Sequence, residues 1–283
     1  AVRHALEHGV ELTSDIDMLL AEIDKPVVAI TGSNGKTTVT PLVGRMAAAS
    51  GLQAAVGGNI GTPVLDFLQP GQRWDIYVLE LSSFQIERSK SPAAVAASIL
   101  NISPDHMDRY PGLAAYQQAK QRIYPASRCA VFNRDDKLTY PLLGRGQTSI
   151  SFGAGEPDLK QYGLVREGGV NWLARGHELL LSSADMKLHG EHNQLNALAA
   201  LALGEAAGLP REVMVSVLRD FGGLQHRCQW LGERDGVEFF NDSNGTNTGA
   251  TIAAVKGLSR RPKDIVLIAG GQGKGADLSG LQQ

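Results

Sequence analysis

The sequence predicts an α/β fold with a mostly parallel sheet plus a small antiparallel sheet, followed by a truncated Rossmann-like α/β domain. Three observations support this. Short apolar runs of strand length alternate with longer helical patterns, an order typical of parallel sheets with helices on both faces. Between about residues 148 and 188, short alternating runs separated by glycine-rich turns indicate antiparallel strands. After a Phe-Gly-Gly hinge at residues 221–223, a strand-and-helix alternation begins again.

The first part of the chain is expected to alternate strands and helices in order. Strands are expected at residues 27–30, 76–81, 95–102 and 130–133, and helices at residues 38–50, 113–124, 193–208 and 212–220. Gly51 would end the first helix, because glycine favours the left-handed conformation of a C-terminal cap. Pro41 would lie in the first turn of that helix, where a missing N–H is tolerated.

The last part of the chain predicts a strand at residues 237–240, a helix near residues 248–258 and a strand at residues 265–269. Two strands and one helix cannot easily bury a core alone. We therefore expect residues 1–26 to be the tail and linker of a missing domain, residues 27–223 to be a central domain, and residues 224–283 to be a partial C-terminal domain.

Composition is that of an ordinary soluble globular protein. The 283 residues are 43% hydrophobic and 20% charged, with a formal net charge of -2, which gives no reason to expect nucleic acid or an anionic membrane as a partner. Two distant cysteines fit a reducing compartment. No apolar run approaches the ~20 residues of a membrane span, and charged residues interrupt any apolar signal near the start. We expect a cytoplasmic monomer.

The run VVAITGSNGKTT at residues 27–38 is the most informative stretch. It indicates a buried strand, a glycine turn and a helix start suited to a nucleotide triphosphate. Gly32 and Gly35 let backbone N–H groups approach phosphate oxygens, Lys36 can bridge the outer phosphates, and Thr37 can hold Mg²⁺. The glycine usually found six residues before the lysine is Ile30 here. The alternative is an ordinary strand–turn–helix junction.

Polar side chains at the ends of later strands point to the same kind of site. Glu80 ends a buried strand, at the edge that faces the ligand crevice in open α/β sheets, and its carboxylate suits Mg²⁺; the alternative is a salt bridge. His106 lies in an Asp- and His-rich run at residues 101–111 and could ligate a metal or serve as a structural hydrogen-bonder. From spacing alone, Lys120 is a solvated lysine on an amphipathic helix.

Further candidates lie at the ends of later elements. Asn193 and Asn196 share one face at the start of a helix, where they could cap the helix or contact a base edge. Arg227, at the expected domain junction, could reach across the cleft to ATP. Polar turns at residues 241–247 and 270–275 would occupy the ligand-facing edge of the second α/β unit.

Together these motifs resemble the Mur ligases, the ATP-dependent amino-acid ligases of peptidoglycan synthesis. The resemblance runs from about residue 10 to residue 283 and rests on GSNGKTT (32–38), GGNIG (57–61), LELSSFQ (79–85), DHMDRY (105–110) and NDS (241–243). It implies an ATPase central domain and, within residues 1–26, the tail of a UDP-binding domain. It further implies UDP-N-acetylmuramoyl-L-alanine and D-glutamate as substrates, with a role in cell wall biogenesis, cell shape and cell division.

The resemblance also implies roles for single residues. The ATP-binding residues would be Gly32, Ser33, Asn34, Gly35, Lys36, Thr37, Thr38, Asn193, Asn196, Arg227 and Asp242. Two Mg²⁺ ions would be held by Thr37, Glu80, His106 and Lys120, the last carbamylated by carbon dioxide, and the catalytic residues would be Lys36, His106 and Lys120. Substrate contacts would come from Asn59, Ser82, Thr246 and Lys274. The chain departs from the family pattern at Cys228, Asn244 and Gln272.

The implied reaction is transfer of the ATP γ-phosphoryl group to a carboxylate, followed by attack of an amine on the acyl phosphate. Another ligase of the superfamily, such as a folylpolyglutamate synthetase, is an alternative. A third possibility is that this chain acts only as an ATP-binding module.

Overall fold

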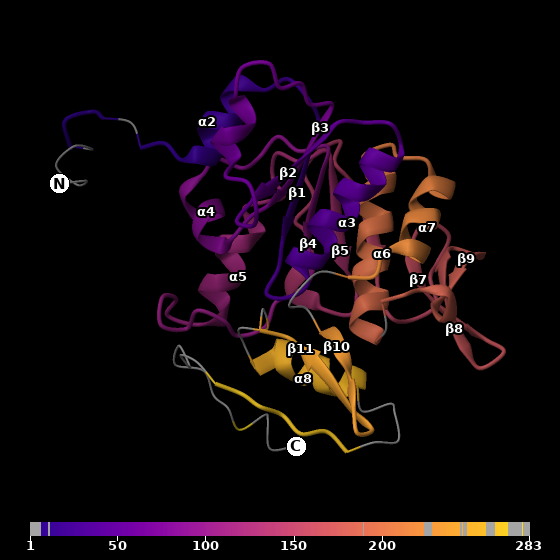
Figure 1. Ribbon diagram of the computed structural model, residues 1–283. Coiled ribbons are helices and arrows are strands. Elements are labelled where there is room, and N and C mark those ends of the chain that lie inside the picture. Colours follow the sequence, from indigo (N-terminus) through magenta and orange to yellow (C-terminus); the bar gives the residue numbers. More distant parts are fainter. Residues whose placement is uncertain are drawn as a thin grey trace.

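The computed structural model describes residues 7–10, 12–188, 190–223, 228–243, 245, 248–258, 264–270 and 279. Its main body is a nine-stranded sheet with helices on both faces (Figure 1). The strand order is β2-β3-β1-β4-β5-β6-β7-β8-β9. The strands are β1 (Val27–Thr31), β2 (Ala54–Gly58), β3 (Ile76–Glu80), β4 (Ala96–Ile99), β5 (Cys129–Asn133), β6 (Thr148–Phe152), β7 (Tyr162–Glu167), β8 (Val170–Arg175) and β9 (Glu178–Ser182).

Two hydrophobic cores lie on the two faces of this sheet. The helices are α2 (Asp15–Glu22), α3 (Lys36–Ala49), α4 (Ser83–Arg88), α5 (Leu113–Gln121), α6 (Glu191–Ala206) and α7 (Arg211–Asp220), with short 3-10 turns η1 (Val64–Leu68), η2 (Lys137–Thr139) and η3 (Ser183–Asp185). Helices α3, α6 and α7 cover one face and α2, α4 and α5 the other (Figure 1). Successive β1 residues alternate between the two cores, as the two-residue period of a strand requires.

The predicted fold class is confirmed, with one difference in how the strands join. Strands β1 to β6 pair in parallel, β7 joins β6 through one parallel pair, and β7, β8 and β9 are antiparallel. The antiparallel strands therefore continue the main sheet instead of forming a separate one. Residues 148–152, expected among the antiparallel strands, pair in parallel with β5, because the open edge of β5 offers unpaired backbone groups.

Some boundaries also differ from the predictions. Helix α3 begins at Lys36, two residues earlier than expected, so Pro41 lies in its second turn and cannot donate to the carbonyl of residue 37. The sequence did not predict β2, α2 or α4. Helix α2 packs Ile16 and Leu19, both almost fully buried, into the core that also contains β1 and β3 residues. Helix α4 begins with a capping box formed by Ser82 and Gln85.

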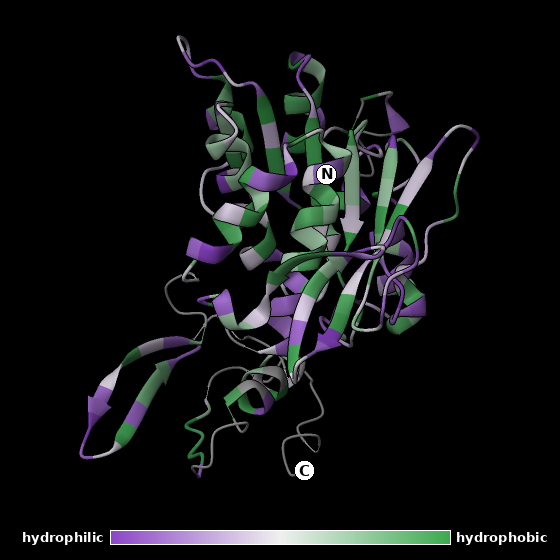
Figure 2. Ribbon diagram, turned by 90° about the vertical axis from the view of Figure 1, so that its right-hand side faces the viewer, coloured by the Kyte–Doolittle hydropathy of each residue, from purple (hydrophilic) through white to green (hydrophobic). Residues whose placement is uncertain are grey.

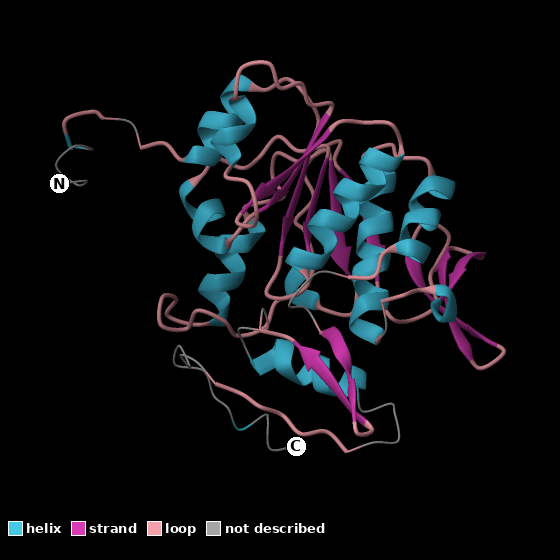
Figure 3. Ribbon diagram, in the orientation of Figure 1, coloured by secondary structure: helices cyan, strands magenta, loops and turns pink. Residues whose placement is uncertain are grey.

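The C-terminal part contains an antiparallel hairpin of β10 (Gln229–Arg234) and β11 (Val237–Asn241), followed by α8 (Thr248–Leu258). Figure 2 shows the hairpin projecting away from the main sheet. The predicted strand at residues 237–240 and the predicted helix at 248–258 are confirmed. The strand expected at residues 265–269 is wrong, because residues 264–270 form a loop (Figure 3). No described strand lies beside this loop, and Val266 and Ile268 are 88% and 95% exposed.

Across the described part of the chain, none of the helices combines the length and the apolar character needed to cross a bilayer.

Candidate functional site

The candidate phosphate loop, residues 32–35, joins the carboxyl end of β1 to the first turn of α3. Gly32 and Gly35 have φ angles of 153° and 86°, and a Cβ on Gly35 would overlap the side-chain oxygen of Asn196. The positive φ favours glycine at position 35, and a Cβ there would also require the Asn196 side chain to move. Gly35 is the N-cap of α3, so the positive end of the helix dipole lies at this loop, where an anion is stabilised.

The segment after β4 holds the phosphate loop in place. The Asn101 side chain accepts a hydrogen bond from the Asn34 backbone N–H at 2.8 Å and donates one to the Asn34 carbonyl at 3.0 Å. The Ser33 N–H donates to the Asn101 carbonyl, and the Ser33 hydroxyl bonds both the N–H and the carbonyl of Ser103 at 2.9 Å. The loop conformation is therefore fixed by a neighbouring strand end.

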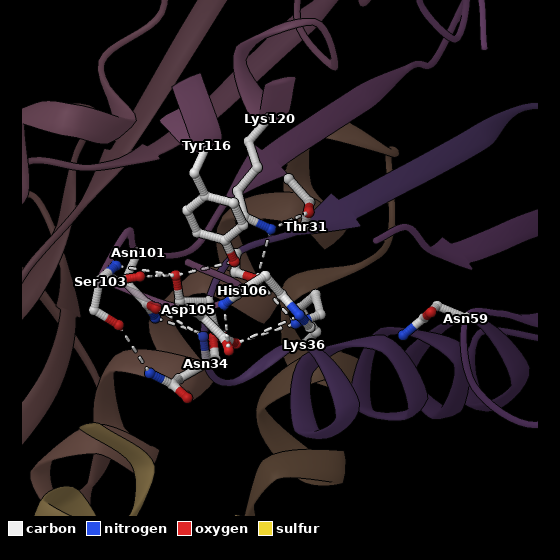
Figure 4. A network of polar contacts seen from close by, with 12 residues as sticks. Thr31, Asn34, Lys36, Asn59, Asn101, Ser103, Asp105, His106, Tyr116 and Lys120 are labelled. Atoms are coloured by element: carbon white, nitrogen blue, oxygen red, sulfur yellow. Dashed lines mark hydrogen bonds and ion pairs between the residues drawn. The ribbon is translucent and has the colours of Figure 1, made fainter. Parts of the chain in front are cut away.

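Two lysine ammonium groups converge on the carbonyl of Gly32. Lys36 Nζ donates to it at 2.9 Å and to the Ser33 carbonyl at 3.2 Å. Lys120 Nζ, from α5, donates to the same Gly32 carbonyl at 3.0 Å and to Thr31 Oγ1 at 3.2 Å. Figure 4 shows Lys120 between Thr31 and the ring of Tyr116; the distance from Nζ to the ring centroid is 4.6 Å.

The surroundings of Lys120 disfavour its charged form. Its side chain is 1% exposed, so the interpretation of Lys120 as a solvated lysine is wrong. Burial, and next the positive charge of Lys36, lower its pKa well below the ordinary 10.5, although the charges of Asp105 and Glu80 act in the opposite direction. A larger share of the amine is therefore neutral and nucleophilic than for an exposed lysine.

Glu80 lies at the carboxyl end of β3 and is 2% exposed. Its Oε1 accepts a hydrogen bond from the Asn59 side chain at 3.1 Å, whereas Oε2 is buried and has no hydrogen-bond partner among the described residues. No described basic side chain forms an ion pair with Glu80, so the salt-bridge alternative is not supported. A buried carboxylate oxygen without a donor fits a hard cation such as Mg²⁺.

His106 has a positive φ of 55° and lies among aromatic side chains. Its ring centroid is 4.9 Å from that of Phe84 and 6.4 Å from that of Tyr116. The distance from His106 Nε2 to Asp105 Oδ2 is 3.7 Å, too long for a hydrogen bond. Within the described ranges there is no group of three or more His, Cys, Asp and Glu side chains able to hold a metal; Mg²⁺ usually takes one or two carboxylates together with phosphate oxygens.

A cavity of about 130 Å³ lies beside the phosphate loop. It is lined by residues of the main sheet domain and by residues of the segment that contains the β10–β11 hairpin and α8. Predicted nucleotide-binding residues that line it are Asn34, Gly35, Thr38, Asn193, Asn196 and Asp242. Asn196 donates to the Asn193 side chain at 3.3 Å, and the N-cap of α6 is Gly190. The alternative role of Asn193 as a helix cap is therefore wrong. Asp242 Oδ1 accepts from the N–H of Cys228 at 2.9 Å.

The remaining predicted residues fall into two groups. Thr37 lies in the first turn of α3 and is partly exposed. Ser82 caps α4: its hydroxyl accepts from the Gln85 N–H and the Gln85 side chain accepts from the Ser82 N–H. Arg227, Thr246 and Lys274 lie outside the described residues.

Sequence reasoning assigned no role to Asn101, Ser103 or Tyr116. Asn101 lies two residues beyond the end of β4, at the carboxyl edge of the sheet, and this position could have pointed to a role at the site. Tyr116 precedes Lys120 by four residues, so the two side chains share a face of α5. Ser33 and Ser103 lie on two different loops, and no sequence pattern predicted their contact.

Comparisons with known proteins identify the family of this chain. The Mur ligase middle domain model matches residues 30–204. Proteins named UDP-N-acetylmuramoylalanine--D-glutamate ligase are 53% identical in Pseudomonas syringae pv. tomato, 51% in Nitrosococcus oceani and 50% in Pseudomonas aeruginosa, each along the whole chain. The chain spans about 63% of the length of these curated relatives.

Solved structures show the same fold at low sequence identity. MurF from Acinetobacter baumannii matches with a TM-score of 0.70 and 22% identity, over 86% of this chain and 56% of that protein. A pseudomurein peptide ligase type C from Methanothermus fervidus matches with a TM-score of 0.68 and 21% identity, over 88% of this chain and 59% of that protein. Because the family model covers more than half of the chain, the chain belongs to the Mur ligase family.

Proposed function

We propose that this chain provides the ATP-binding part of a ligase that adds D-glutamate to UDP-N-acetylmuramoyl-L-alanine in peptidoglycan precursor synthesis. The observation that carries the reaction type is the convergence of Lys36 and Lys120 on the Gly32 carbonyl, beside a buried carboxylate at the ligand-facing sheet edge. The choice of substrates is supported by the names of relatives that are 50–53% identical. We also propose a cytoplasmic monomer.

The reaction needs a better leaving group than hydroxide on the alanine carboxyl. A carboxylate oxygen attacks the ATP γ-phosphorus, the bond to the β–γ bridging oxygen breaks, and ADP leaves. The D-glutamate nitrogen then attacks the acyl phosphate carbon, the carbon–oxygen bond to phosphate breaks, and the nitrogen loses a proton. Lys36 moves from its loop carbonyls to the outer phosphates and stabilises the charge on the transferring oxygens.

Mg²⁺, when bound, would neutralise phosphate charge, with Thr37 and Glu80 as ligands at one site and His106 and Lys120 at the other. Glu80 fits this role because its Oε2 is buried without a partner among the described residues. We propose that Lys120 acts as a carbamate, formed when its amine attacks carbon dioxide and loses a proton. The change replaces the buried amine beside the partly buried Lys36 with an anion, so that the two groups attract each other.

The nucleotide and substrate contacts complete the proposal. Asn193, Asn196 and Asp242 would contact the nucleoside, since they line the cavity beside Gly35. Asn59 and Ser82 would contact the muramoyl substrate. Arg227 would reach ATP, and Thr246 and Lys274 would contact D-glutamate; these three assignments rest on the family motifs alone.

The test is Lys36→Ala in the intact protein, assayed for ATP- and D-glutamate-dependent formation of the dipeptide product. Loss of one charge-assisted contact to the transferring phosphoryl group should reduce kcat by roughly 10²–10³. Product formation by Lys36→Ala at the wild-type rate would contradict the proposed reaction. A carbamate carbon signal in NMR spectra with ¹³C-labelled bicarbonate, absent from Lys120→Ala, tests the modification separately.

Simple assays distinguish the proposed function from two alternatives, another ligase of the superfamily and an ATP-binding module. Activity with L-glutamate or diaminopimelate instead of D-glutamate would indicate another ligase of the superfamily. Because the chain spans only about 63% of its relatives, ATP binding and ligation should both be measured on this chain and on a full-length relative. Binding without ligation by this chain identifies it as an ATP-binding module.

A further inference from the structure

Two hydrogen bonds tie Asn59 to Glu80 at the ligand-facing edge of the sheet. The Asn59 backbone N–H donates to the Glu80 carbonyl at 2.8 Å, and the Asn59 side-chain amide donates to Glu80 Oε1 at 3.1 Å. One residue therefore contacts both the main chain and the carboxylate of Glu80. Such a double contact fixes the position of the carboxylate and its rotation about the last side-chain bond.

The glycines before Asn59 make this approach possible. Gly58 has a φ of 108°, and a Cβ there would overlap the backbone oxygen of Glu80. A Cβ on Gly57 would overlap the backbone oxygen of Thr62. The chain leaving β2 can therefore lie directly on the end of β3, which brings the Asn59 amide within reach of Glu80.

The two carboxylate oxygens of Glu80 have different surroundings. Oε1 is occupied by the Asn59 donor, whereas Oε2 is buried and has no hydrogen-bond partner within the described ranges. A carboxylate that ligates a metal through one oxygen is commonly held by a hydrogen bond to its other oxygen, which fixes its orientation. The arrangement seen here has that form.

We propose that Asn59 is a positioning residue that holds the Glu80 carboxylate with Oε2 directed at a divalent cation bound together with ATP. This assignment rests on the proposed ATP site and goes beyond a substrate contact for Asn59. It predicts that Asn59 affects the cation even when the muramoyl substrate is absent. A residue that only binds the substrate has no such effect.

The experiment measures the binding of Mn²⁺, a paramagnetic substitute for Mg²⁺, to the intact protein with saturating ATP and no muramoyl substrate. Loss of a partner that orients a metal ligand typically costs about 10–100-fold in metal affinity, so Asn59→Ala and Asn59→Leu should raise the Kd for Mn²⁺ by that factor. Asn59 is exposed, so neither variant leaves a cavity in the core. The affinity for ATP without metal should be unchanged.

Glu80→Gln supplies the matched control. In that background, Asn59→Ala should cause no further loss of Mn²⁺ affinity, because the group that it positions is gone. The proposal is overturned if Asn59→Ala leaves the Mn²⁺ Kd unchanged and raises only KM for the muramoyl substrate. It is also overturned if the two substitutions weaken Mn²⁺ binding additively. Neither outcome depends on which amino acid is ligated, so the result is independent of the proposed specificity.

Discussion

Replacing Asn101 with alanine tests whether the end of β4 holds the phosphate loop in its binding conformation. The substitution removes the two hydrogen bonds between the Asn101 side chain and the backbone of Asn34, at 2.8 and 3.0 Å. Each such bond contributes about 0.5–1.5 kcal/mol, so the observed loop conformation loses about 1–3 kcal/mol relative to its alternatives. If ATP binds this conformation, its affinity should fall by roughly 5–150-fold.

The assay is calorimetric titration of ATP into the intact protein and its variants. Gln121→Ala is the control, because its side-chain amide donates to the carbonyls of Leu138, in η2, and Tyr140, at 2.9 and 3.1 Å, away from the phosphate loop. That variant should bind ATP like the wild type. An Asn101→Ala protein whose ATP Kd stays within about twofold of the wild type would refute the reasoning, since twofold is well below 1 kcal/mol.

Two further predictions concern Lys120 and Gly35. In protein freed of carbon dioxide, where Lys120 keeps an unmodified amine, burial lowers the native pKa of Lys120 below the ordinary 10.5, so the unfolded chain binds the additional proton. The free energy of unfolding should therefore rise by about 1.4 kcal/mol per pH unit between the two pKa values. Gly35→Ala should destabilise the loop by at least about 1 kcal/mol through its positive φ and weaken ATP binding further by overlap with Asn196.

Urea titrations across the alkaline range below pH 10.5 measure the pH dependence of the free energy of unfolding, with Lys120→Met as the comparison. A wild-type pH slope that persists in Lys120→Met would contradict the assignment to this amine. For Gly35, the control is Gly51→Ala: Gly51 has nearly the same φ, 85°, but a Cβ there would meet no atom within 4 Å. Equal losses of ATP affinity in both variants would show that overlap with Asn196 has no effect.

The sequence predicted the buried central strands but not the edge strand β2. Strands β1, β3, β4 and β5 are mostly apolar, and their burial follows from helices on both faces. Strand β2 has the sequence AAVGG, whose small residues carry little strand preference. It forms because it pairs with β3 over five residues, a contact that depends on the three-dimensional arrangement.

The candidate site divides in the same way. Lys36 and Glu80 lie where the sequence predicted, just after β1 and at the carboxyl end of β3, and their roles stay predictions. The burial of Lys120 could not be predicted from helical spacing, because Thr31 and the phosphate loop cover it from another element. The Asn101 contacts depend on how two loops from neighbouring strands meet. A local sequence pattern does not predict such a contact between distant segments.

The reciprocal bonds between Asn34 and Asn101 have a consequence for protein engineering. A phosphate-binding loop is often treated as a short segment that can be moved between scaffolds, but here the conformation of residues 32–35 depends partly on residues 101–103, in the loop that follows β4. A graft that carries the loop alone leaves its backbone without these partners. The transferable unit is a pair of adjacent strand ends, and a recipient scaffold must offer two parallel neighbours in the register of β1 and β4.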